Sequence, residues 1–315
     1  IHKHGEQTRS MTLLKSPADS HSMQIFNTPA SPDPASVEPP TGQLLANAPG
    51  CDYAPPMHTP IYTIETCRAA FQLRWSLTVF PDVDLPPTDT WRPLLSALTE
   101  NDGVRVLEGK QLANRSLVFL LSTTPAVAPP SIVKSVKGRL QALFRPELYV
   151  GFRRNFRLTS VGDANLSAVE EYVRSQLVHH HPGNEHPAWL SEFQYTFPDT
   201  ELARPINSAH GQYVIAFHLV LVHDGRWRTV TSDFLHRSAR ALRDAATKKQ
   251  HRLSTLSLLL DHLHCTLGTS YRERPDEIVV SYMNNIAFRH GMLNLWMPSY
   301  YVGTIGPYDM NAIRS

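Results

Sequence analysis

At 315 residues, with 42% hydrophobic and 18% charged residues, the chain has the composition of a soluble globular protein long enough for two domains. Its formal net charge of +2 indicates no particular partner, and its apolar runs are far too short to cross a membrane. Three cysteines without metal-type or redox-type spacing cannot all pair, so we expect a reducing cytosolic setting and no disulfide scaffold.

Residues 1–62 are predicted to form a disordered tail. Ten of the 25 prolines fall in the first 60 residues, where no apolar periodicity is sustained. The segment lacks the basic start and apolar core of a secretory signal. Because the chain opens on Ile1, we expect a translated fragment, with Met11 or Met23 as candidate starts.

Residues 63–181 are predicted to form one domain in which strands and helices alternate. Asn165 and Ser167 stand where the last helix needs its cap. The predicted elements, in order, are a strand at 69–80, a helix at 90–98, strands at 104–110 and 115–123, a helix at 131–143, a strand at 152–159 and a helix at 166–179.

Residues 182–209 read as a linker with a possible strand at 193–197, and residues 210–315 repeat the order of the first domain. The second set of predicted elements is a strand at 212–223, a helix at 231–249, strands at 253–259 and 261–267, a helix at 275–288, a strand at 294–302 and a helix from Asp309.

Three separated blocks of sequence recur at a nearly constant spacing. Residues 71–79 resemble 213–221, 142 positions later, and residues 160–169 resemble 304–313, 144 positions later. Residues 116–120 align with 261–265 at an offset of 145. We interpret the chain as two copies of one α+β domain. The order β-α-β-β-α-β, followed by a further helix, predicts a ferredoxin-like antiparallel sheet with helices on one face.

His262 and His264 are the first candidate site residues. They are two apart in a predicted strand, so both imidazoles point to the same side of the sheet. Two convergent imidazoles could share a divalent ion, although two core histidines with hydrogen-bond partners would show the same spacing.

Tyr172 and Gln176 are the second candidate pair, four apart on one face of the predicted helix at 166–179. A tyrosine attacks phosphorus usefully when a metal polarises the phosphate, and Gln176 offers a carbonyl oxygen as a third ligand. The alternative is a helix whose tyrosine packs on the sheet and whose glutamine is solvated.

Two local basic segments are candidates for contact with phosphates. Residues 134–157 hold seven Lys or Arg and one acid, and residues 226–252 hold eight Lys or Arg and two acids. Solvated helix faces would look the same. The candidate DNA-binding residues are Lys134, Lys137, Arg139, Arg153, Arg154, Arg157, Arg237, Arg240, Lys248 and Lys249.

These residues resemble the HUH single-tyrosine transposases, nearest their REP-associated branch. The resemblance covers roughly residues 65–181 and 210–315. It is carried by Asp-His-Leu-His at 261–264, Ser-Val-Gly at 160–162, and the pattern Tyr-hydrophobic-x-x-Gln-x-x-His-His at 172–180. It implies a Mg²⁺ or Mn²⁺ ion held by His262, His264 and Gln176. It also implies that Tyr172 forms a 5′-phosphotyrosine bond with single-stranded DNA, in the cytoplasm of a bacterium and in association with the nucleoid.

The two copies depart from the family pattern in opposite ways. The alignment places Leu117 and Phe119 at the paired histidines, so the first copy is predicted to have lost them. Ser315 aligns with Glu171, so the residue equivalent to Tyr172 would come next. We therefore expect an intramolecular pseudo-dimer, monomeric as a chain, in which Tyr172 and Gln176 of the first copy serve His262 and His264 of the second.

The leading hypothesis for function is a single-stranded DNA nickase and strand transferase that acts on a hairpin-forming element. The alternative is a domesticated protein that binds hairpin or single-stranded DNA without cutting it. An RNA-binding module on the same kind of sheet is disfavoured, because the aromatic submotifs of an RNA-recognition motif are missing from the central strands.

Overall fold

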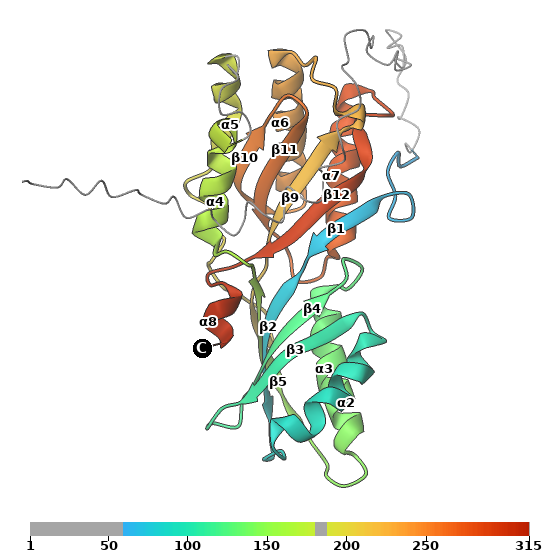
Figure 1. Ribbon diagram of the computed structural model, residues 1–315, viewed down its shortest axis with the longest axis vertical. Coiled ribbons are helices and arrows are strands. Elements are labelled where there is room, and N and C mark those ends of the chain that lie inside the picture. The colour runs from blue at the N-terminus through green and yellow to red at the C-terminus, as the bar shows by residue number, and fades with distance from the viewer. Residues whose placement is uncertain (1–58, 180–187, 315) are drawn as a thin grey trace, which may run out of the picture. The chain divides into compact units, whose positions relative to one another are not determined.

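The order strand, helix, two strands, helix, strand, helix occurs twice in the computed structural model (Figure 1), as the sequence predicted. The structure describes residues 59–179 and 188–314, and all of them belong to one compact unit. His180 and most of the expected tail lie outside the described residues. Within the described ranges, no helix combines the length and apolarity that a membrane span requires.

The first half follows the predicted bounds closely, except that one strand and one helix are each divided. Its elements are β1 (Arg68–Gln72), β2 (Arg74–Pro81), α2 (Thr88–Glu100), β3 (Val104–Gln111), β4 (Leu117–Thr123), α3 (Pro129–Phe144), β5 (Phe152–Val161), α4 (Leu166–Arg174) and α5 (Gln176–His179).

The connecting segment contains the 3₁₀ helix η1 (Ala188–Phe193), the strand β6 (Gln194–Thr196), which had been predicted within 193–197, and β7 (Ile206–Asn207). The elements of the second half are β8 (Gly211–Val214), β9 (Ala216–His223), η2 (Asp224–Arg226), α6 (Ser232–Lys248), β10 (Arg252–Leu258), β11 (His262–Gly268), α7 (Pro275–His290), β12 (Trp296–Ile305) and α8 (Met310–Arg314).

The strands form two six-stranded mixed sheets. The C-sheet has the order β1-β12-β9-β11-β10-β6, and the N-sheet has the order β3-β4-β2-β5-β8-β7. Each sheet includes a short strand from the other half of the chain, since β1 pairs in parallel with β12 and β8 pairs in parallel with β5. The expectation of purely antiparallel sheets was therefore wrong. The strands predicted at 69–80 and 212–223 break at Leu73 and Ile215, and their first segments join the opposite sheet.

The two halves of the chain cross where β5 leads into α4 and where β12 leads into α8. Reciprocal hydrogen bonds join the two crossing segments. The Ser160 hydroxyl donates to the carbonyl of Ile305 over 2.6 Å. The Thr304 hydroxyl donates to the carbonyl of Val161, also over 2.6 Å. All four residues are buried, so each bond satisfies a carbonyl that water cannot reach.

Two glycines make this close crossing possible. The amide of Leu166 donates to the carbonyl of Gly306 (2.7 Å), and the amide of Met310 donates to the carbonyl of Gly162 (3.2 Å). A Cβ atom on Gly306 would lie 1.9 Å from the Ser160 carbonyl oxygen, and one on Gly162 would also meet backbone oxygens. The Ser-Val-Gly motif thus has a structural role, because only glycine lets the two backbones pass at this distance.

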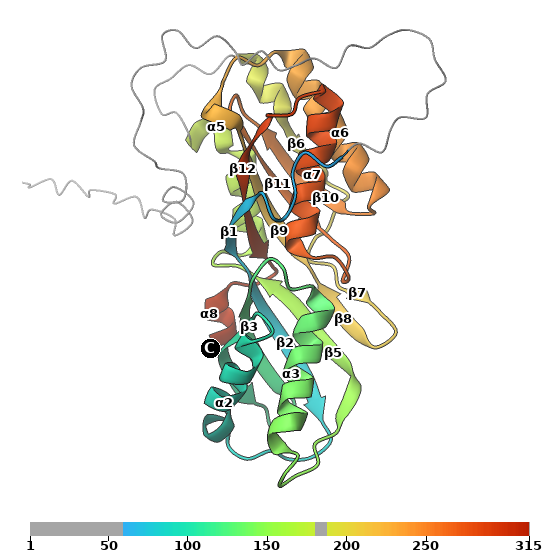
Figure 2. The same ribbon diagram turned by 90° about the vertical axis from the view of Figure 1, so that its right-hand side faces the viewer.

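Helix α4 crosses to the C-sheet, where it packs on β10 and β11 (Figure 1). The Ser254 hydroxyl of β10 donates to a Glu170 carboxylate oxygen of α4 over 2.5 Å. Helices α6 and α7 pack on the opposite face of this sheet. Figure 2 shows α7 in front of the C-sheet and α3 in front of the N-sheet. The C-sheet therefore carries helices on both faces, not on one as predicted.

Residues 59–62 do not behave as the end of a tail. Tyr62 is buried, and its amide donates to the Asn284 side chain of α7 over 3.0 Å. Its hydroxyl accepts from the amide of Trp296 at the start of β12 (2.7 Å). These two hydrogen bonds fix Tyr62, which the sequence analysis assigned to the tail, to the second half of the chain.

Candidate functional site

Strand β11 presents the paired histidines on the face of the C-sheet that α4 covers. Side chains alternate along a strand, so His262 and His264 share one face while Leu263 and Cys265 join the core under α6 and α7. The two imidazole rings lie 5.1 Å apart between centroids. His264 is only 3% exposed. The histidine pair is thus enclosed between the sheet and the helix that crosses from the first half.

Tyr172 lies against His264 of this pair. The Asn165 side chain caps α4 by accepting from the amide of Ala168 (3.0 Å), as the sequence predicted, and the helix places Tyr172 two turns later. The Tyr172 ring meets the His264 ring edge to face, with centroids 5.8 Å apart and an interplanar angle of 79°. A tyrosine of the first half and a histidine of the second therefore share one site.

His218 on β9 is a third imidazole that the sequence analysis missed. Its Nε2 lies 3.0 Å from Nδ1 of His264. The centroid of the His218 ring lies 6.1 Å from the centroid of the Tyr172 ring. Complete burial lowers the pKa of His218 to about 4, so the ring is neutral at neutral pH. The missed signal was the alternation of β9, which puts His218 on the same face as Val220 and Val222.

The His262 ring is oriented by a carboxylate. Its Nδ1 lies 2.7 Å from Oδ1 of Asp261, and the Arg226 guanidinium lies 3.5 Å from the other Asp261 oxygen. Burial acts to raise the pKa of Asp261, but its hydrogen bond to His262 and its electrostatic interactions with His262, Arg228 and Arg226 hold that pKa well below its usual range. Asp261 therefore stays ionised beside the imidazole at every physiological pH.

Gln176 is fully buried at the start of α5, where the predicted helix at 166–179 breaks after Ser175. Its amide nitrogen donates to the carbonyl of Tyr172 over 2.8 Å. Its side-chain oxygen has no hydrogen-bond partner among the described residues. A buried, unpaired carbonyl oxygen is costly unless something binds it, and a cation is one such ligand.

No group of three or more His, Cys, Asp or Glu side chains is arranged to hold a metal ion within residues 59–179 and 188–314. The donors expected from the sequence are of a mixed kind, the imidazoles of His262 and His264 and the amide oxygen of Gln176. Nδ1 of His262 engages the partly buried Asp261, and Nδ1 of His264 engages the buried His218. Metal-ligating histidines in proteins usually engage their second ring nitrogen in this way.

Tyr301 on β12 completes the aromatic surround of the site and was also missed. Its ring centroid lies 5.7 Å from that of His218. Burial, with smaller contributions from Asp163 and Tyr172, raises the pKa of Tyr301 to about 12. Its hydroxyl therefore stays protonated across the physiological range.

The expected counterparts of the histidines in the first half were assigned one residue out of register. Leu77 of β2 pairs with Phe119, whereas Leu219, its equivalent 142 residues later, pairs with Cys265. Phe119 therefore corresponds to Cys265 and not to His264. A slip of one residue moves every side chain to the other face of the sheet.

The true counterparts of His262 and His264 are Ser116 and Val118, by the same register. The Phe119 ring instead packs edge to face on Trp91 of α2, with centroids 6.3 Å apart. The first half thus lacks imidazoles at these positions, as expected. The residues that stand there are Ser116 and Val118, and not Leu117 and Phe119 as named from the sequence.

The two candidate DNA-binding side chains Lys137 and Arg139 of α3 have intramolecular partners. The Lys137 ammonium donates to the carbonyls of Arg153 and Asn155, over 2.8 and 3.2 Å, and so joins α3 to β5. The Arg139 guanidinium forms two hydrogen bonds to Asp102, and these bonds lower the pKa of Asp102 to about 2.

The other basic candidates are dispersed over the surface. Arg237 pairs with Asp233 one turn away on α6, and Lys249 lies 3.9 Å from Glu273. Helix α6 packs on the face of the C-sheet opposite to α4, so its basic residues do not line the histidine cluster. The exposed candidates without an ion pair among the described residues are Lys134, Arg153, Arg154, Arg157, Arg240 and Lys248.

Comparisons with known proteins give likenesses to solved structures alone. No family model matches the chain, and no curated protein matches it. A protein assigned as a transposase of Deinococcus radiodurans R1 is 24% identical over 31% of this chain and 84% of its own, with a TM-score of 0.28. A REP-associated tyrosine transposase bound to a REP hairpin is 15% identical over 32% of this chain and 59% of its own, with a TM-score of 0.26. At such TM-scores, any functional conclusion has to rest on the residues of this chain.

Proposed function

We propose that this protein is a transposase-like nickase and strand transferase of single-stranded DNA, with Tyr172 as its nucleophile. The observation that carries the proposal is the edge-to-face contact of Tyr172 with His264, at 5.8 Å between ring centroids. A nucleophile from one half of the chain and imidazoles from the other would then form one composite active site. The DNA partner would be a single strand or a hairpin.

We further propose that the two halves are fused ferredoxin-like domains that form an intramolecular pseudo-dimer. Two observations support this. The strand order β8-β5-β2-β4-β3 of the N-sheet repeats the order β1-β12-β9-β11-β10 of the C-sheet. The reciprocal hydrogen bonds of Ser160 and Thr304 have the symmetry that a two-fold axis between equivalent halves would produce.

The residues that would hold a divalent ion, Mg²⁺ or Mn²⁺, are His262, His264 and Gln176. Asp261 and His218 would orient the two imidazoles through their Nδ1 atoms. The ion would act as a Lewis acid on the phosphate that Tyr172 attacks. The buried side-chain oxygen of Gln176, which has no partner among the described residues, supports this donor set.

The reaction would proceed by displacement at phosphorus. The Tyr172 oxygen bonds to phosphorus as its hydroxyl proton leaves, and the bond from phosphorus to the 3′ oxygen breaks. The leaving oxygen takes up a proton and becomes a free 3′-hydroxyl, while the 5′ phosphate remains on Tyr172. Enclosure of Tyr172 between α4 and the C-sheet would keep the nucleophile oriented toward the bound phosphate.

The proposal is tested by incubating the full chain with labelled single-stranded hairpin DNA and Mn²⁺ and by resolving covalent adducts on a denaturing gel. We expect an adduct with the unmodified protein and none with Tyr172→Phe, His262→Ala or His264→Ala. Tyr213→Phe, which changes a partly buried tyrosine of the N-sheet, is the matched control and should retain the adduct. An adduct that survives Tyr172→Phe would overturn the assignment of the nucleophile.

The loss of imidazoles at Ser116 and Val118 favours a second candidate, a domesticated protein that binds hairpin DNA without cutting it. The same experiment distinguishes the two. Retained hairpin binding with no adduct under Mg²⁺, Mn²⁺ or any other divalent ion would establish the binding protein. Adduct formation that requires His264 would exclude it.

A further inference from the structure

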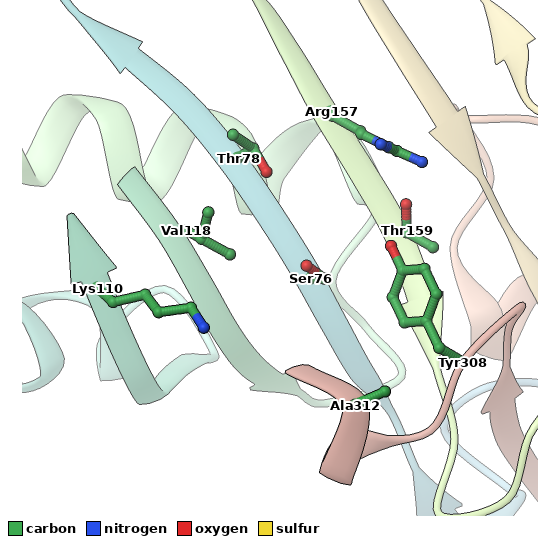
Figure 3. A pocket seen from close by; sticks show the side chains of 8 residues that line it. All are labelled: Ser76, Thr78, Lys110, Val118, Arg157, Thr159, Tyr308 and Ala312. Atoms are coloured by element: carbon green, nitrogen blue, oxygen red, sulfur yellow. The ribbon is translucent and has the colours of Figure 1, made fainter. Parts of the chain in front are cut away.

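The N-sheet carries a pocket of about 300 Å³ on the face that faces α8 (Figure 3). It occupies the position that the histidine cluster occupies on the C-sheet. Ser76 of β2 corresponds to His218, and Val118 of β4 corresponds to His264, by the strand pairing of the two halves. Both Ser76 and Val118 line the pocket. The place of the lost imidazoles is therefore a cavity with a different lining.

Hydroxyl groups and cations converge on this pocket. Ser76, Thr78 and Thr159 contribute hydroxyls from β2 and β5, and Arg157 and Lys110 contribute positive charge from β5 and β3. Figure 3 shows these side chains around one hollow. The described residues that line it include no acidic side chain. Such a lining disfavours a cation and favours an anion with several acceptor oxygens.

One buried hydroxyl in this pocket needs a partner. Thr159 is 1% exposed, and its hydroxyl oxygen has no hydrogen-bond partner among the described residues. Arg157, two residues earlier on the same face of β5, is exposed and forms no ion pair with any described residue. A buried hydroxyl without a partner costs free energy, and an oxyanion beside Arg157 would satisfy it.

We propose that this pocket binds a phosphate group through the hydroxyls of Ser76, Thr78 and Thr159 and the positive charges of Arg157 and Lys110. Tyr308, whose side chain extends from the segment before α8 toward Thr159 in Figure 3, closes one side of the site. The phosphate is either a free anion or a phosphodiester of a nucleic-acid strand. The inference does not depend on cleavage, because the pocket lies on the N-sheet and the histidine cluster lies on the C-sheet.

Titration of the full chain with inorganic phosphate, followed by amide chemical shifts, tests the proposal. We expect the amide signals of Ser76, Val118 and Thr159 to move. Arg157→Gln should weaken phosphate binding about tenfold or more, the range for a lost charge-assisted hydrogen bond. The matched control is Arg145→Gln, which removes the same charge from the end of α3, outside the pocket, and should leave the affinity unchanged.

Thr159 allows a test that is independent of charge. Thr159→Val removes the hydroxyl at nearly constant volume and should weaken phosphate binding, whereas Thr159→Ser keeps the hydroxyl and should retain binding. Pocket signals that do not respond to phosphate would overturn the proposal. So would equal affinities for Arg157→Gln and Arg145→Gln.

A short single-stranded oligonucleotide identifies the source of the phosphate. If it shifts the same signals and competes with inorganic phosphate, the pocket holds a phosphodiester. If those signals do not move, the pocket binds the free anion and not a phosphodiester, and the proposal of a phosphate site is upheld. Tyr172→Phe should abolish adduct formation and leave the phosphate titration unchanged, so failure of the nuclease proposal and failure of this one are separate results.

Discussion

The Tyr172 ring meets the His264 ring edge to face, at 79° and 5.8 Å between centroids, although the two residues lie in different halves of the chain. Helix α4 makes this contact possible because it leaves the N-sheet after Gly162 and packs on β10 and β11 of the C-sheet. The candidate site therefore depends on the crossing of the two halves as much as on the residues that form it.

His218 should act as a positioning residue for His264, since the two rings are joined by a 3.0 Å hydrogen bond. We expect His218→Ala to lower the metal-dependent rate of adduct formation about 10- to 100-fold. The Mn²⁺ concentration needed for half-maximal activity should rise as well, which a purely structural defect would not cause. Titration of the rate with Mn²⁺ measures both quantities. An unchanged Mn²⁺ midpoint would contradict the positioning role.

Gly306 should be intolerant of a side chain, because a Cβ would lie 1.9 Å from the Ser160 carbonyl oxygen. Gly306→Ala is expected to lower the free energy of unfolding by about 2 kcal/mol or more. Gly138→Ala in α3 is the control, since its Cβ meets nothing within 4 Å, and it should raise stability by about 0.5–1 kcal/mol. Urea unfolding measures both. Equal effects would show that the crossing is not close-packed.

The strand register makes opposite predictions for Phe119 and Val118. Phe119 is fully buried against Trp91, so Phe119→His should cost several kcal/mol through a cavity and a desolvated imidazole. Val118 is partly exposed and lines the N-sheet pocket, so Val118→His should be tolerated at much lower cost. Comparison of urea midpoints tests the register. The reverse order of stabilities would restore Phe119 as the counterpart of His264.

Stability should fall as the pH is lowered through the range in which buried histidines titrate. Burial lowers the pKa of His223 and that of His290 to about 4. In the unfolded chain these imidazoles bind protons near pH 6.5. Between pH 6.5 and 4 the unfolded state holds more protons, so the free energy of unfolding falls as the pH is lowered through this window and is fully retained above it.

Urea unfolding at a series of pH values between 4 and 8 measures this slope. His290, whose ring stacks on Phe234 and lies 2.8 Å from the Ser238 hydroxyl, provides the variant. His290→Gln should flatten the slope by about one proton. A slope identical to that of the unmodified chain would show that His290 does not contribute.

Much of the secondary structure followed from local patterns. The alternation of apolar residues predicted the strands to within a few residues, and Asn165 was correctly identified as the cap of α4. The repeated order of elements was predicted as well, because two stretches of similar sequence form similar elements wherever they occur. Local preference and side-chain periodicity act over a few residues, so they can be read directly from the chain.

The pairing of strands could not be read in this way. The breaks at Leu73 and Ile215 send β1 and β8 to opposite sheets, and the register that aligns Phe119 with Cys265 is a property of hydrogen bonds between distant segments. The partnership of His218 with His264 and the hydroxyl-lined pocket around Thr159 arise in the same way. Residue types and their periodicity were thus properties of the linear chain. The neighbours of each side chain depended on long-range packing, because a shift of one residue in strand register moves every side chain of that strand to the other face of the sheet.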